Sequence, residues 1–270
     1  MSLDSGERIR SSLVAYDDEL KLGWHQHDEA VLVLNLNGWV RESVGNAELV
    51  GRPFQIGIKP PGIAHSDHFG PAGLRAIRVT IPGNLHAMLA EQAPALSRWG
   101  WLDHPPARRI LLRSLEPNRT ETDPTRLDDL MEALAALEQT REAASPRAMP
   151  PWIQDAVREI EAAFPMSPRL TDLAARTGVH RIYFARRFRQ HLGCSVGTYI
   201  RRLRLRMAAD ALAHGRGSLA GTAQLAGFTD QPHFTRVFRS ETGFTPARYF
   251  RAVRTVGFHH SRPTAEPTSD

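Results

Sequence analysis

The sequence predicts an α+β protein of more than one domain: an N-terminal β-barrel of the jelly-roll type with helices, then an all-α C-terminal domain. Three observations lead to this fold class. Short strand-like runs separated by glycine and proline fill the first hundred residues. A repeat with an offset of about fifty residues covers Leu170 to Arg251. The net positive charge of the chain is concentrated in its C-terminal part, from Trp152 on.

Length and composition indicate a protein with room for two hydrophobic cores in its 270 residues. The single cysteine, Cys194, excludes an intrachain disulfide and is typical of a reducing cytoplasm. The N-terminus lacks a basic start followed by an apolar run, and no stretch approaches the ~20 apolar residues of a membrane span. We therefore expect a cytoplasmic protein with no membrane partner.

The charge is unevenly distributed. From Trp152 to the end there are 18 arginines, no lysine and 9 acidic residues, a net charge of +9. Because the whole chain carries +5, residues 1–151 carry −4. A basic half beside an acidic half predicts a polyanionic partner for the basic half alone.

The N-terminal region contains several strand-like runs. The run from Val31 to Leu36 is apolar on both faces, as in a strand buried on both sides. The dipeptide Asn37-Gly38 then predicts a hairpin turn. A second turn is predicted at Gly45-Asn46, and Phe54, Ile56 and Ile58 then alternate with polar or small residues. The chain is predicted to turn again at Pro60-Pro61-Gly62, and Leu74 to Ile81 is predicted to be a further strand.

Three histidines lie in two short motifs of this region, His25-Gln26-His27 and Pro60-Pro61-Gly62-Ile63-Ala64-His65. These motifs resemble the two half-motifs of cupins, H-x-H and P-x-G-x-x-H. The resemblance implies a small barrel in which His25, His27 and His65 converge, as they would to bind a metal ion. The usual cupin glutamate is replaced by Val31 and Leu32, so we expect no metal. We expect the three histidines instead to line or rim a small-molecule effector pocket, or to fill the mouth of the barrel.

Two further segments, 84–101 and 125–140, are predicted to be helices. In the second, apolar residues recur at helical spacing, with acidic residues on the other side. This apolar face either packs on its own barrel or forms a dimer seam. Residues 143–151, rich in proline, are predicted to be an interdomain linker, and Trp152 to Phe164 an amphipathic helix.

The repeat consists of two copies of a helix, a glycine turn and a second helix. Gly178 and Gly227 are predicted to end the first helices, since glycine adopts the left-handed conformation without steric cost. Seven residues are identical at an offset of fifty: Phe184/Phe234, Arg186/Arg236, Phe188/Phe238, Arg189/Arg239, Gly193/Gly243, Tyr199/Tyr249 and Arg201/Arg251. The phenylalanines, four residues apart in each copy, are predicted to be core. Such units are typical of helix-turn-helix proteins, whose second helix enters the major groove of DNA.

The second copy resembles the AraC/XylS family of bacterial transcription regulators. The motif residues run from Gly227 to Arg239, then Gly243-Phe244-Thr245-Pro246 and Tyr249, and the resemblance covers Trp152 to Arg254. It implies two helix-turn-helix units joined by a long helix, and many such regulators carry a cupin-like sensor. We therefore expect four segments: a cupin-like effector-binding domain at 1–105, a helical dimerisation and linker segment at 106–151, a tandem helix-turn-helix DNA-binding domain at 152–258, and a disordered tail at 259–270.

The resemblance also implies which residues face DNA. Base contacts are expected from Ile182, Ala185, Arg186, Gln231, His233 and Arg236. Arginine suits bidentate contact with guanine and glutamine suits adenine. Phosphate contacts, which fix register, are expected from Arg181, Arg189 and Arg239. For any one arginine the alternative is a solvated charge or an ion pair with an acid such as Asp172 or Glu241.

The sequence thus predicts a DNA-binding transcription regulator that responds to a small-molecule effector. The alternative is a metal-dependent cupin enzyme with an appended DNA-binding module, which the missing glutamate disfavours. No catalytic residue and no cofactor are expected. The expected partners are double-stranded DNA, an unidentified effector, RNA polymerase if the protein activates transcription, and a second copy of the chain.

Overall fold

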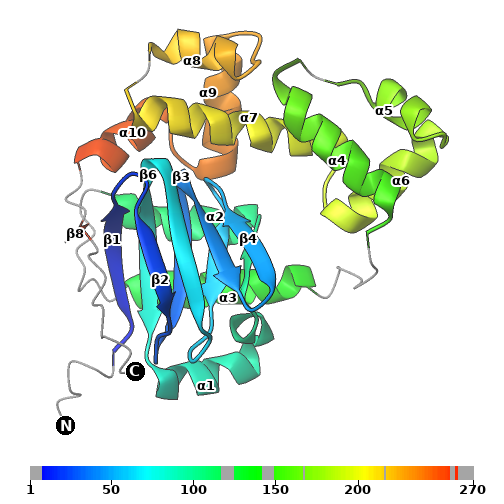
Figure 1. The fold of residues 1–270 in the computed structure, drawn as a ribbon. Helices are drawn as coiled ribbons and strands as arrows, with labels where there is room; N and C mark the ends of the chain where they lie inside the picture. The colour runs from blue at the N-terminus through cyan, green and yellow to red at the C-terminus, as the bar shows by residue number, and fades with distance from the viewer. Residues whose placement is uncertain are drawn as a thin grey trace. The chain divides into compact units, whose positions relative to one another are not determined.

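The structure, a computed structural model, describes residues 8–116, 125–141, 149–166, 168–215, 217–255 and 259–260. The chain forms two compact units (Figure 1). Unit 1 comprises Met1–Glu138 and Glu241–Asp270, and unit 2 comprises Gln139–Ser240. The predicted linker lies mostly outside the described residues, and the predicted domain boundaries stay predictions.

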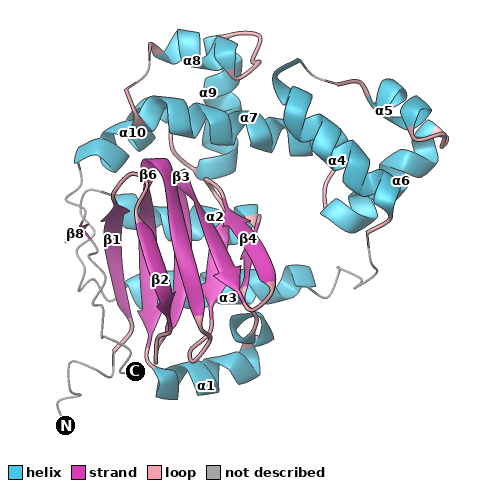
Figure 2. Cartoon of the chain, in the orientation of Figure 1, coloured by secondary structure: helices cyan, strands magenta, loops and turns pink. Residues whose placement is uncertain are grey.

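Unit 1 is built on one mixed sheet. Its strands are β1 (Arg10–Tyr16), β2 (Lys21–His25), β3 (Ala30–Val44), β4 (Ala47–Gly51), β5 (Ile56–Lys59), β6 (His65–Ile81), β7 (Gly100–Leu102) and β8 (His259–His260). The order is β7-β5-β3-β6-β1-β8, with β2 also on β6 and β4 also on β3. Figure 2 shows these strands as one curved layer with helices α2 and α3 behind it.

The two long strands, β3 and β6, organise the sheet. One half of this antiparallel pair adds β1 and β5, and the other half adds β2 and β4. The register shifts twice in between, near Asn37 and Gly38. The predicted hairpin turn at Asn37-Gly38 is therefore wrong. Gly38 has φ 75°, and a Cβ there would lie 1.9 Å from the Gly73 carbonyl oxygen, so the pair forms a bulge within a continuous strand.

The helices of unit 1 are α1 (Gly83–Gln92), α2 (Pro105–Leu111), α3 (Thr125–Arg141) and α10 (Pro246–Thr255), with 3₁₀ turns η1 (Pro94–Ser97) and η2 (Leu112–Leu115). The helix predicted at 84–101 is shorter because Pro94 interrupts it. On α3, Leu130, Leu134 and Leu137 are buried. This supports packing within the protomer, since these side chains are not free for a dimer seam.

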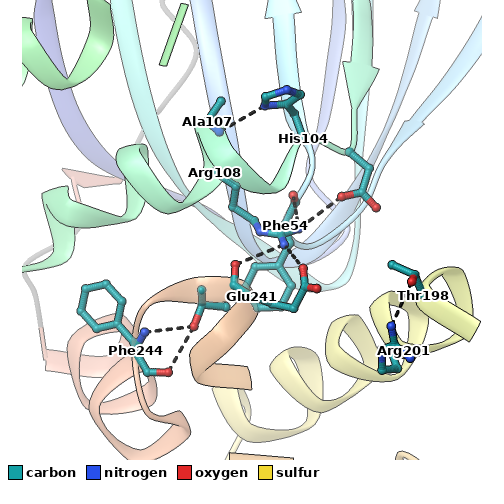
Figure 3. Close-up of polar contacts among 10 residues, drawn as sticks. Phe54, His104, Ala107, Arg108, Thr198, Arg201, Glu241 and Phe244 are labelled. Carbon is teal, nitrogen blue, oxygen red and sulfur yellow. Dashed lines mark hydrogen bonds and ion pairs between the residues drawn. The ribbon is translucent and has the colours of Figure 1, made fainter. Parts of the chain in front are cut away.

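The last part of the chain joins unit 1 through buried polar contacts. Arg108, at 2% exposure, donates to the Glu241 carboxylate at 2.6 Å (Figure 3). The buried Tyr249 hydroxyl donates to the Leu36 carbonyl at 2.8 Å. His259 and His260, assigned from the sequence to a disordered tail, instead form β8, because their main chain pairs with the edge of β1.

Unit 2 is helical. It contains α4 (Pro151–Ala163), η3 (Phe164–Met166), α5 (Leu170–Arg176), α6 (Arg181–Leu192), α7 (Val196–Ala213), α8 (Leu219–Leu225) and all but the last two residues of α9 (Gln231–Thr242). The bounds of α5 recur in α8 at an offset of 49, and those of α6 recur in α9 at an offset of 50. The offset of 50 is that of the seven identical residue pairs, and the offset of 49 is that between Gly178 and Gly227.

The predicted phenylalanines lie in the core of unit 2. Phe184, Phe188, Phe234 and Phe238 are all fully buried. Helices α6 and α9 each begin with a side-chain cap: His180 accepts from the Ile182 amide, and Asp230 accepts from the His233 amide at 2.6 Å. In the described part of the chain, no helix combines the length and apolar character needed to cross a membrane.

Candidate nucleic-acid interface and histidine cluster

Helix α6 presents one exposed stripe opposite its buried phenylalanines. The stripe contains Arg181, Ile182, Ala185, Arg186 and Arg189, which lie at helical spacing on one face. Ile182 is 67% exposed, the three arginines are exposed and Ala185 is half-buried. The structure thus brings together all five residues predicted for the first unit.

Helix α9 carries the corresponding stripe at Gln231, Arg236 and Arg239, all of which are exposed. His233 differs, because it is half-buried and its ring packs edge-on against Phe228, with the centroids 5.6 Å apart. Of the six residues predicted to contact bases, His233 therefore has its ring already engaged within the protein.

Within the described parts of the chain, the stripe arginines have no carboxylate partners. Among the described residues, no acid forms an ion pair with Arg181, Arg186, Arg189, Arg236 or Arg239. Glu241, one of the two acids considered as a partner, pairs with Arg108 instead. Other arginines of unit 2 are engaged: Arg176 pairs with Glu159, and Arg158 with Asp155. Both helices that the repeat singles out therefore carry exposed arginines without a carboxylate partner among the described residues.

A groove of about 630 Å³ borders the α6 stripe. Ala185, Arg186 and Arg189 line one side of it, and the starts of α5 and α7 line the rest, including Leu170 and Val196. Its wall is mainly apolar apart from the arginines. A chemical group seated there would meet a cationic rim over a non-polar floor.

The second site is the histidine cluster of unit 1, defined as His25, His27 and His65. One ring nitrogen from each lies within 4.8 Å of the others. The ring centroids of His25 and His65 are 4.2 Å apart, and that of His27 lies about 5 Å from both. His25 ends β2 and pairs with His65 at the start of β6. The structure thus brings together the three histidines that the sequence singled out.

Buried charges lie beside the histidine cluster. The Lys59 ammonium is 2.5 Å from Glu42 and 3.4 Å from Asp67. Glu42 also accepts from the indole nitrogens of Trp99 at 3.0 Å and Trp101 at 2.8 Å. Burial acts to lower the pKa of Lys59, but the two carboxylates raise it above its ordinary value. Lys59 therefore stays charged.

The same environment keeps two of the imidazoles neutral. Burial, reinforced by the neighbouring His65 imidazole and by the positive charge of Arg78, lowers the pKa of His27 to about 3. Burial and the Lys59 ammonium lower the pKa of His65 to about 4. Neutral imidazoles keep a nitrogen lone pair that can accept a hydrogen bond or bind a metal.

The sequence analysis missed Glu42, Lys59 and Asp67. All three are buried and polar in a region otherwise rich in apolar core residues. For Asp67 a signal was present, since a residue two positions after His65 on a strand points to the same face. Nothing local marks Glu42 or Lys59, because their pairing depends on strand register.

Comparison with known proteins agrees with the helical geometry. The family model described as "Helix-turn-helix domain" matches residues 173–252. The probable transcription factor PqrA of Proteus vulgaris is 32% identical over 81 residues, which is 30% of this chain and 66% of that protein. The regulatory protein PocR of Salmonella typhimurium is 29% identical over 101 residues, 37% of this chain and 33% of PocR.

Among solved structures, ToxT of Vibrio cholerae aligns over 90% of this chain and 98% of its own, at 9% identity and a TM-score of 0.38, a likeness too weak to support an argument. The chain spans between a third and two thirds of the length of PqrA and PocR. The C-terminal helices form a DNA-binding domain of the helix-turn-helix class. More narrowly, this domain is of the AraC type, as its motif residues predict.

Proposed function

We propose that this protein is a transcription regulator of the AraC/XylS type that binds specific double-stranded DNA through α6 and α9 and responds to a small-molecule effector bound in unit 1. The observation that carries the proposal is the repeated stripe of exposed, unpaired arginines on two helices whose bounds differ by 50 residues. A surface that serves only solubility needs no such repetition.

The proposed DNA-binding domain contains two helix-turn-helix units, α5–α6 and α8–α9. Their tight turns contain Gly178 and Gly227, with φ 69° and 81°, where glycine avoids the strain of a side chain. Helix α7, 18 residues long, connects the units. A continuous helix, at ~1.5 Å rise per residue, is a rigid spacer between the two proposed DNA-binding units.

We assign residue roles by chemistry. Arg186 and Arg236 occupy equivalent positions and suit the O6 and N7 acceptors of guanine, while Gln231 suits adenine. Ile182 and Ala185 offer apolar contact to a thymine methyl group. Arg181, Arg189 and Arg239 suit phosphates. His233 retains a base-reading role in the proposal only if its ring turns away from Phe228.

The proposed effector domain is the curved sheet of unit 1, which we take to be a cupin-like barrel with the histidine cluster in its interior. The buried charges of Glu42, Lys59 and Asp67 offer both signs to a polar ligand. Recruitment of RNA polymerase and pairing with a second copy of the chain are further parts of the proposal, each consistent with a regulator.

The proposal is tested by electrophoretic mobility shift with the intergenic DNA beside the protein's own gene, followed by footprinting. We expect a shifted complex that resists unlabelled non-specific competitor, and a footprint confined to one site. Arg186→Ala/Arg236→Ala should abolish the shift, while Arg158→Ala, which removes a paired arginine on α4, should preserve it. Equal competition by random DNA would contradict sequence-specific regulation.

A further inference from the structure

The groove beside α6 lies between α5, α6 and the start of α7, within unit 2. We call it the α6 groove and define it by an apolar floor and a basic rim, formed respectively by Leu170, Ala185, Val196 and Ile200 and by Arg186 and Arg189. Val196 and Ile200 belong to the hydrophobic core of unit 2, and Leu170 packs against it. The volume of about 630 Å³ lies within the range of roughly 300–1,000 Å³ that small-molecule pockets occupy.

The rim of the α6 groove carries positive charge that the protein does not neutralise. Arg186 and Arg189 are exposed, and no acid in the described ranges forms an ion pair with either. None of the residues that line the groove is acidic. Val196 and Gly197, which begin the 18-residue helix α7, also line it, so the positive end of that helix dipole lies beside the arginines. A matching ligand therefore has an apolar body and an anionic group.

The second copy of the repeat carries bulkier residues at two positions of the groove. At the offset of fifty, Gly197 corresponds to Ala247, and Ile200 corresponds to Phe250. A Cβ on Gly197 would meet only Arg201, whose Nη1 would lie 3.7 Å away, an ordinary van der Waals contact. Glycine at position 197 is therefore not required by its surroundings, and it keeps this side of the groove open.

We infer that the α6 groove binds a small organic anion with an aromatic or aliphatic body, and that this ligand competes with DNA. Guanidinium groups hold a carboxylate through charge-assisted hydrogen bonds, which are about twice as strong as neutral ones. Phosphates and hydrogen-bonding base edges satisfy the rim alone, whereas an apolar body also removes the floor from water. The competition rests on the proposed function, in which Arg186 reads a base and Arg189 contacts a phosphate. DNA binding then has a second input, separate from the effector proposed for unit 1.

The first test titrates the full-length chain into 2-naphthoate without DNA and follows the fluorescence anisotropy of the ligand. We expect saturable binding, and the uncharged 2-naphthamide should bind at least about tenfold more weakly, because it offers the two arginines no charge. Arg186→Ala should weaken naphthoate binding roughly tenfold, as loss of a hydrogen bond to a charged group does. Arg187→Ala is the matched control and should bind normally, because Arg187 bonds to Gln190 and lies over the Tyr183 ring, outside the groove.

The second test blocks the groove. Gly197→Trp adds a large side chain to its wall and should abolish naphthoate binding. If that variant fails to fold, Gly197→Ala/Ile200→Phe copies the residues of the second repeat and should have the same effect. On the DNA site of the wild type, naphthoate at ten times its own dissociation constant should raise the apparent Kd for DNA about tenfold.

Four outcomes would overturn the inference. Wild-type protein that binds no naphthoate would show that the groove takes no such ligand, and equal affinity for naphthamide would exclude recognition of the anion. Unchanged binding by the blocked variants would locate the ligand elsewhere. A wild-type dimer that Gly197→Trp dissociates would make the groove an interface with a second copy. Naphthoate that binds in the groove but leaves DNA affinity unchanged would refute the competition. Because ligand binding is measured without DNA, failure of the DNA-binding proposal would leave those titrations intact.

Discussion

The Arg108 guanidinium donates to the Glu241 carboxylate at 2.6 Å and to the Glu241 carbonyl at 3.2 Å, across 133 residues of sequence. Arg108 also contacts Asp103 at 3.2 Å and lies over the Phe54 ring, 5.5 Å from its centroid (Figure 3). The junction of α9 with the loop before α10 is thereby held within unit 1.

This ion pair predicts that Arg108→Ala destabilises the protein. Removing one partner leaves Glu241, whose side chain is 19% exposed, without its counter-charge, and partial access to water keeps the loss to about 3 kcal/mol. Arg109→Ala, at the next and exposed position of α2, should stay within about 0.5 kcal/mol of wild type. Urea unfolding followed by circular dichroism measures both. Equal midpoints for the two variants would show that the pair contributes nothing.

The bulge in β3 makes the Tyr249 hydroxyl important for stability. Leu36 falls between the paired residues Asn35 and Asn37, so it has no partner in the ladder with β6, and the Tyr249 hydroxyl satisfies its carbonyl. Tyr249→Phe should therefore cost about 1–3 kcal/mol, since a buried acceptor is left without a donor. Amide hydrogen exchange should quicken around Leu36. Tyr199→Phe, the equivalent change in the first repeat, should leave exchange around Leu36 unchanged, because that hydroxyl bonds to Glu161.

Much of the helical fold could be predicted from the sequence, because the repeat records it directly. Identical residues at Phe184/Phe234 and Gly193/Gly243 lie at the same places in α6 and α9 and just after them. The repeat could not reveal that equivalent tyrosines have different partners, because a partner 213 residues away leaves no local pattern. In the sheet, Asn37-Gly38 has the same chemistry in a turn and in a bulge, and only the approach of Gly73 decides between them.

The candidate sites were predictable to different degrees. The exposed stripe of α6 follows from helical spacing once Phe184 and Phe188 are assigned to the core. The resemblance to the cupin half-motifs implied that the three histidines converge. Asp67 and Lys59 were not predicted as site residues, because their roles depend on the pairing of β6 with β2 and β3. Sequence alone does not give that register. The packing of the His233 ring was not predicted, because it depends on the neighbouring aromatic side chain of Phe228.

The two faces of α6 predict opposite effects of neighbouring substitutions. Phe184→Ala should destabilise unit 2 by about 3–5 kcal/mol, because the side chain is fully buried. Ile182→Ala should leave stability near that of wild type, since Ile182 is 67% exposed, and should change base preference at one position. Thermal unfolding and selection from a randomised DNA library separate the two effects. Loss of stability in Ile182→Ala would show that this residue belongs to a packed surface.

The salt dependence of DNA binding should reflect the arginine stripes. Log affinity should fall linearly with log salt concentration, with a slope of about −0.9 for each phosphate neutralised. Arg189→Ala should make the slope shallower by about 0.9 and weaken binding to all sequences alike. Titrations at several salt concentrations by fluorescence anisotropy provide the measurement. An affinity independent of salt would be incompatible with the proposed face.

Footprinting of the Arg186→Ala and Arg236→Ala variants tests the central claim most directly. Two reading helices joined by α7 should occupy successive major grooves about 34 Å apart, so the wild type should protect two short blocks roughly ten base pairs apart. Arg186→Ala should relax base preference in one block and Arg236→Ala in the other, each at a cost of about 1–3 kcal/mol on the cognate site. Altered preference at the same base pairs in both variants, or uniform weakening on every sequence, would contradict the account.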